Sequence, residues 1–137
     1  MKKVFVDTNI FVDLIADRKP FSKFAIELFD RAEKHEVSLF TSTHIIVTTH
    51  YLLKKFIEEK TLRNNLISLL EIVTLVAVDG DVIKRGLKSK FNDFEDAIQI
   101  LCAHKVVDID FIVTRDTRDY KDSGIKVLAP DELVKKI

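Results

Sequence analysis

The sequence predicts an α/β fold in three layers, α/β/α, with a central parallel sheet of roughly five strands. Short apolar runs alternate with longer stretches whose apolar residues recur at helical spacing. This alternation is typical of parallel sheets with right-handed crossovers. The first apolar run, residues 4–6, also passes directly into Asp7. A buried strand that ends in an acidic residue places this residue at the carboxyl edge of the sheet, where open α/β folds bind their ligands.

The individual elements follow from the same patterns. Five runs rich in branched and aromatic residues predict strands at 4–6, 37–42, 73–78, 111–114 and 125–128. Apolar residues at helical spacing predict helices at 10–15, 21–36, 45–56, 62–70, 83–87 and 94–106, and one or two turns after Pro130. Ser42 or Thr43 is expected to cap the third helix. No repeat or linker divides the chain, so we expect one domain over residues 1–137.

Composition excludes several classes of protein. The 137 residues include three glycines and two prolines, which leaves little room for linkers. No apolar stretch is long enough for a signal peptide or a membrane span. The lone Cys102 allows no internal disulfide and favours a cytoplasmic location. The 22 basic and 22 acidic residues balance, which argues against binding nucleic acid by bulk charge alone but does not exclude a nuclease.

Acidic residues follow the predicted strands. Asp7, Asp79 and Asp116 each come after a strand, and Asp93 and Asp96 lie three residues apart on one helical face. Carboxylates that gather at one edge repel one another unless a cation neutralises them, and oxygen ligands suit Mg²⁺ or Mn²⁺. From spacing alone, helix caps and turn residues explain these acids equally well. For Asp79, and for Asp81 beside it, a cap is the better interpretation.

Three motifs carry a family resemblance. They are Val-Phe-Val-Asp-Thr-Asn-Ile at 4–10, Asp-Phe-Glu-Asp-Ala-Ile at 93–98 and Ile-Val-Thr-Arg-Asp at 112–116. In this order and spacing they resemble the PIN (PilT N-terminal) domain, over nearly the whole chain. The resemblance implies a PIN-like, Rossmann-like fold and a metal-dependent ribonuclease that hydrolyses RNA with metal-activated water. Many small members are toxins of VapC-type toxin–antitoxin pairs.

The resemblance also implies roles for particular residues. Three acids would bind Mg²⁺ or Mn²⁺ and act in catalysis: Asp7, Asp96 and Asp116. Five residues would support them: Thr8, Asn9, Asp93, Thr114 and Asp119. Among these, the hydroxyls of Thr8 and Thr114 are expected to hydrogen-bond the carboxylates.

One position departs from the family pattern. PIN nucleases usually carry a glutamate on the helix after the second strand, and here Thr48 takes that place, with no acid at 41–57. The chain then resembles a VapC-like subgroup in which this glutamate is replaced. The loss removes a negative charge and favours an alternative, a degenerate PIN domain that binds RNA or protein without cleaving. A third class is a phosphatase with Asp7 as nucleophile, but such enzymes carry a second Asp where this chain has Asn9.

Basic residues near the motifs suggest contacts with RNA. Arg115, between Thr114 and Asp116, is the strongest expectation for a phosphate contact. Other basic residues flank the acidic motifs. Arg118 and Lys121 follow Asp116, and four precede Asp93, where a solvated helix face explains them equally well: Lys84, Arg85, Lys88 and Lys90. His44 and His50 are more simply structural. By resemblance, the expected partners are RNA, an antitoxin protein and a second copy of the chain in a homodimer, with no membrane.

Overall fold

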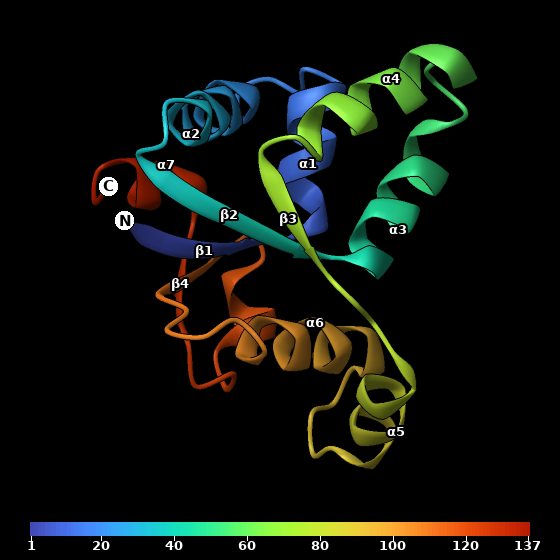
Figure 1. The fold of residues 1–137 in the computed structure, drawn as a ribbon, viewed down its shortest axis with the longest axis vertical. Helices are drawn as coiled ribbons and strands as arrows, with labels where there is room; N and C mark the ends of the chain where they lie inside the picture. Colours follow the sequence, from blue (N-terminus) through green and yellow to red (C-terminus); the bar gives the residue numbers. More distant parts are fainter.

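A parallel five-stranded sheet lies at the centre of the computed structural model, which describes residues 1–137 (Figure 1). Its strands are β1 (Lys2–Val6), β2 (Val37–Ser42), β3 (Val73–Val76), β4 (Phe111–Val113) and β5 (Lys126–Leu128). They lie in the order β3-β2-β1-β4-β5, and every neighbouring pair is parallel. The three-layer α/β/α fold predicted from the sequence is therefore confirmed.

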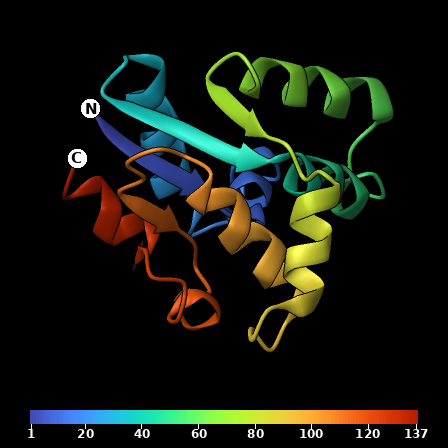
Figure 2. The same ribbon diagram turned by 60° about the horizontal axis from the view of Figure 1, so that its bottom comes forward.

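Helices cover both faces of this sheet. On one face lie α1 (Thr8–Ile15), α2 (Ser22–Glu33), α3 (Thr43–Leu53), α4 (Glu59–Leu69) and α7 (Pro130–Val134). On the other face α5 (Gly80–Lys88) packs beside α6 (Phe94–His104), as Figure 2 shows. A short 3-10 helix, η1 (Thr117–Tyr120), follows β4 and contacts α6. None of these helices combines the length and the apolar composition that a membrane-spanning segment requires.

Strand β1 is the centre of the core. Val4, Phe5 and Val6 are each at most 1% exposed, because β1 is paired on both edges and covered on both faces. The main cluster of 24 buried residues surrounds it. A second cluster of four, contributed by α1, α3 and α4, fixes those three helices to one another. The elements that carry the sequence motifs are thus rigidly packed.

Several predicted boundaries shift. Helix α2 ends at Glu33, before the predicted 36, and His35 has a φ of 61° as the chain turns into β2. Helix α4 begins at Glu59 instead of 62, because the Glu58 carboxylate accepts the backbone N–H groups of Lys60 and Thr61. Strand β3 ends at Val76, two residues early. The 3-10 helix was not predicted.

The topology places the motifs at one edge. From β1 the chain moves outward to β2 and β3 on one side, and β4 and β5 then add on the other side. The order therefore reverses between β1 and β4, the position where α/β sheets bind ligands at the carboxyl ends of their strands. Val6 pairs with Val113, so the next residues, Asp7 and Thr114, are neighbours.

Candidate active site

Asp7 lies at the end of β1 and caps α1. Its carboxylate accepts hydrogen bonds from the Thr8 backbone N–H at 2.8 Å, the Thr114 hydroxyl at 2.7 Å and the Tyr120 hydroxyl at 3.1 Å. Burial raises the pKa of Asp7, and the bonds from Thr114 and Thr8 partly offset this effect. The carboxylate is therefore fixed in position by three donors.

Asn9 and Thr114 connect this acid to the next one. The Asn9 side-chain N–H₂ donates to Asp116 Oδ2 and to Thr114 Oγ1, each at 3.2 Å. The backbone N–H of Asp116 donates to the same Thr114 hydroxyl oxygen at 3.0 Å. Asp7 and Asp116 thus belong to one network that runs from α1 to the segment after β4. The expected hydroxyl bond to a carboxylate is confirmed for Thr114 but wrong for Thr8, which contributes its backbone N–H instead.

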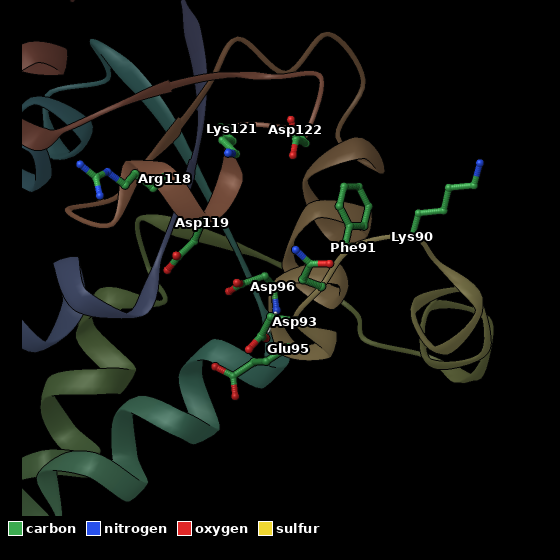
Figure 3. Close-up of a pocket in the computed structure, with 10 residues that line it drawn as sticks. Lys90, Phe91, Asp93, Glu95, Asp96, Arg118, Asp119, Lys121 and Asp122 are labelled. Carbon is green, nitrogen blue, oxygen red and sulfur yellow. Dashed lines mark hydrogen bonds between the residues drawn. The ribbon is translucent and has the colours of Figure 1, made fainter.

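Asp96 comes from the other face of the sheet, in the first turn of α6. Asp93 caps this helix by accepting the Asp96 backbone N–H at 3.0 Å, so the cap considered as an alternative to a role at the metal site is present. Burial, followed by the negative charges of Asp93, Asp119 and Asp7, raises the pKa of Asp96 to about 7. Figure 3 shows Asp119, on η1, and Asp96, on α6, near each other in the space between these two elements. Acids from the end of β1, from α6 and from η1 therefore act on one another electrostatically.

Two adjoining hollows meet at these acids. One, of 690 Å³, is lined by Asp7, Asn9, Asp116 and, from α3, Thr48. The other, of 720 Å³, is lined mainly by charged residues of the α6 and η1 segments (Figure 3). The acids common to both are Glu95, Asp96 and Asp119. Thr48, the position in which the family usually carries a glutamate, thus lines the same hollow as the acids.

The basic residues divide between these hollows and other places. Arg18 lines the first hollow and Lys90, Arg118 and Lys121 line the second, so these cations flank the acids. Arg115, the residue expected to contact phosphate, lines neither. Its guanidinium is paired with the buried Asp13, and this placement does not support a phosphate contact.

Other residues from the sequence analysis lie away from the acids. Asp79 caps α5 by accepting the Val82 N–H, as expected, and pairs with Lys105. His50 contacts Glu59. His44 contacts Gln99 and Thr48, next to the first hollow but within a network that joins α3 to α6.

Three residues at the site were missed in the sequence. Tyr120 is a single aromatic residue in a charged turn, and no spacing pattern distinguishes it; it is 2% exposed and donates to Asp7. Arg18 follows α1 in a loop and likewise carries no pattern. Glu95 precedes Asp96 directly, so its proximity to the first hollow could have been expected from the motif.

By chemistry, these residues suit a hard divalent cation. All candidate ligands are oxygen atoms, and burial, followed by the charges of the neighbouring carboxylates, raises the pKa of Asp96. No three His, Cys, Asp or Glu side chains are close enough together to form a complete coordination group. The site therefore has the donors for Mg²⁺ or Mn²⁺ without a preassembled metal shell.

The raised pKa of Asp96 predicts a pH effect on stability. Because its folded-state pKa is about 7 against a usual 3.8, folding binds protons in this range. Without divalent ions, we expect the free energy of unfolding to fall as pH rises from about 4 to about 7. Urea titrations across this range should show a shallower fall for Asp96→Asn, and an unchanged one for the exposed control Asp131→Asn. Equal slopes in wild type and Asp96→Asn would contradict the assignment.

The chain belongs to the PIN domain family, whose sequence model matches residues 3–118. The match includes all three motifs, with Asp7, Asn9, Thr114 and Asp116, and ends just before Asp119 and Tyr120. The resemblance inferred from the sequence is therefore confirmed.

Among its relatives, the chain is 28% identical to Ribonuclease VapC1 from Aquifex aeolicus (strain VF5), over 98% of this chain and 95% of that protein. Its fold is similar to that of VapC20 from Mycobacterium tuberculosis, a toxin that cleaves the sarcin–ricin loop. That comparison has a TM-score of 0.69 and 18% identity, and covers 89% of this chain and 95% of the other. A toxin–antitoxin complex from Klebsiella pneumoniae gives a TM-score of 0.65 at 23% identity, over 93% and 97% of the two chains.

Proposed function

We propose that the chain is a Mg²⁺- or Mn²⁺-dependent endoribonuclease that hydrolyses RNA phosphodiesters, and that it is the toxin of a toxin–antitoxin pair. The observation that carries the proposal is the convergence of Asp7, Asp96 and Asp116, from three motifs, on one open hollow at the switch point of the sheet. Its similarity over nearly the full length to a VapC ribonuclease supports the same activity.

In this proposal, Asp7, Asp96 and Asp116 would hold the metal, which would supply an activated water and stabilise the leaving oxygen. Tyr120, Thr114 and the Thr8 N–H hold the Asp7 carboxylate in place. Asn9 holds Asp116. The flanking cations, Arg18 on one side and Lys90, Arg118 and Lys121 on the other, are suitably placed to attract the phosphates of an RNA strand.

The ends of the RNA products test this mechanism. Attack by water makes no use of the ribose 2′-hydroxyl as nucleophile, so we expect products without 2′,3′-cyclic phosphates. A substrate with a single 2′-deoxynucleotide at the cleavage position should still be cut. Cyclic phosphate ends, or loss of cleavage on 2′-deoxy substitution, would contradict hydrolysis by water.

Thr48→Glu is expected to tighten Mn²⁺ binding by about tenfold, because an added carboxylate in the first hollow increases the ligand charge available to the ion. Isothermal calorimetry measures the dissociation constant directly. Thr48→Gln is the matched control, since it has the same length without the charge. If both variants bind Mn²⁺ as wild type does, Thr48 does not face the metal.

A second function is supported by the same position. Because Thr48 gives no carboxylate and no three acids form a complete coordination group, a PIN domain that binds RNA or protein without cleaving is the alternative. This alternative predicts that RNA binds equally well with and without a divalent metal ion, and that no cleavage products form in either condition.

We propose two protein partners. The similarity to a solved toxin–antitoxin complex favours an antitoxin. A homodimer is favoured by exposed apolar side chains on α3 at the rim of the first hollow. Val47, Tyr51 and Leu52 line that hollow and are 67%, 60% and 45% exposed, and Phe56 after the helix is 81% exposed. Sedimentation of the purified chain, compared with Tyr51→Glu/Phe56→Glu, distinguishes a dimer that uses this surface from a monomer.

A further inference from the structure

A partly buried ion pair, between Asp13 and Arg115, lies behind the candidate active site; the Arg115 side chain is 26% exposed. Asp13, on α1, is 1% exposed. Its carboxylate accepts two hydrogen bonds from the Arg115 guanidinium, from Nε at 2.6 Å and from Nη2 at 3.1 Å. The guanidinium also stacks on the Phe21 ring, 4.0 Å from its centroid. Arg115 is therefore fixed on two sides, by α1 and by the α1–α2 loop.

Such a pair is a poor means of gaining stability. Removing a charge such as the Asp13 carboxylate from water costs several kcal/mol, and apolar residues of similar size often stabilise a fold as well or better. What a two-point guanidinium–carboxylate contact does provide is a defined direction, because the planar fork fits the carboxylate in one orientation. The pair is thus suited to fixing the position of a backbone segment.

The segment it fixes carries one of the three acids. Arg115 stands between Thr114, which donates to Asp7, and Asp116. Its own backbone N–H donates to Asn9 Oδ1 at 3.2 Å, and Asn9 in turn donates to Asp116. Asp116 itself is exposed, and Asn9 is the only residue that donates to its carboxylate. Its position consequently depends on how firmly the residue before it is held.

We propose that the Asp13–Arg115 pair is a positioning device for Asp116, which sets its carboxylate against Asp7 before the metal binds. Asp13 and Arg115 are positioning residues that touch neither metal nor RNA. This inference rests on the proposed function, because it concerns the geometry of the metal-binding acids.

The test is Mn²⁺ binding by the double variant Asp13→Asn/Arg115→Gln, measured by calorimetry on protein shown by circular dichroism to be folded. Both charges are removed together, so no unpaired buried charge remains. We expect the affinity to fall about 10- to 100-fold, as is usual when residues behind metal ligands are changed. The matched control, Asp81→Asn/Arg85→Gln, neutralises an exposed pair on α5 and should bind as wild type does. Wild-type affinity in the double variant would overturn the proposal.

Arg115→Lys provides a second measurement, because it retains the charge but loses the two-point contact. Its Mn²⁺ affinity should fall between those of wild type and the double variant. If the double variant does not fold, wild-type affinity in Arg115→Lys overturns the proposal. A wild-type protein that binds no Mn²⁺ would instead refute the proposed function, so the two failures are distinguishable.

Discussion

Asp96→Asn is expected to abolish detectable Mn²⁺ binding and to reduce RNA cleavage at least about 10³-fold, while the protein remains folded. A metal ion supplies several kcal/mol of transition-state stabilisation, and each 1.4 kcal/mol corresponds to a factor of ten in rate. The fold should be unchanged or slightly stabilised, because the charge that is removed lies beside Asp93, Asp119 and Asp7. Calorimetry, a cleavage assay and thermal unfolding measure the three effects.

The matched control is Asp110→Asn, which changes a carboxylate at the opposite, amino end of β4. Asp110 accepts the Lys3 backbone N–H, so this variant is expected to lose some stability but no Mn²⁺ affinity. Unchanged Mn²⁺ affinity in Asp96→Asn would remove Asp96 from the site. A loss of Mn²⁺ binding in both variants would point to a general effect of charge.

Arg115→Met is expected to lower the free energy of unfolding by about 3–5 kcal/mol, the cost of leaving a buried charge without its partner. Asp13 is 1% exposed and has no other cation within salt-bridge distance. Urea denaturation at pH 7 measures the change. This is the largest effect on stability that we expect from any single substitution near the site.

The double variant Asp13→Asn/Arg115→Met is the internal control for this prediction. It removes the unpaired charge, so most of the lost stability should return. If Arg115→Met alone lowers the free energy of unfolding by less than about 1 kcal/mol, the Asp13–Arg115 pair behaves as an exposed salt bridge, and this prediction is wrong.

Patterns along the chain predict much of the fold, because the strands of a parallel sheet are short apolar runs and its helices have one apolar face. The apolar run at 4–6 predicted the strand that is β1, and Asp7 does follow its carboxyl end. Boundaries were less predictable where a local contact decided them. Glu58, for example, begins α4 earlier than its apolar spacing indicates, by accepting two backbone N–H groups.

The supporting contacts of the site were harder to predict, because they join residues far apart in the chain. Tyr120 donates to Asp7 across 113 positions, and Arg115 pairs with Asp13 across 102. Arg115 illustrates the difficulty most clearly. Its place between Thr114 and Asp116 suggested a phosphate contact, but the register of β4 beside β1 turns the side chain onto α1.

The central claim is that the acids at the carboxyl ends of β1 and β4 and in the first turn of α6 form a metal-dependent ribonuclease site. Its most direct test is incubation of a mixed pool of short RNAs with Mn²⁺ or with EDTA, comparing wild type with Asp7→Asn. We expect cleavage only by the wild type and only with Mn²⁺. Folded wild-type protein that leaves the pool intact with Mn²⁺, or cuts it equally in EDTA, would contradict the claim.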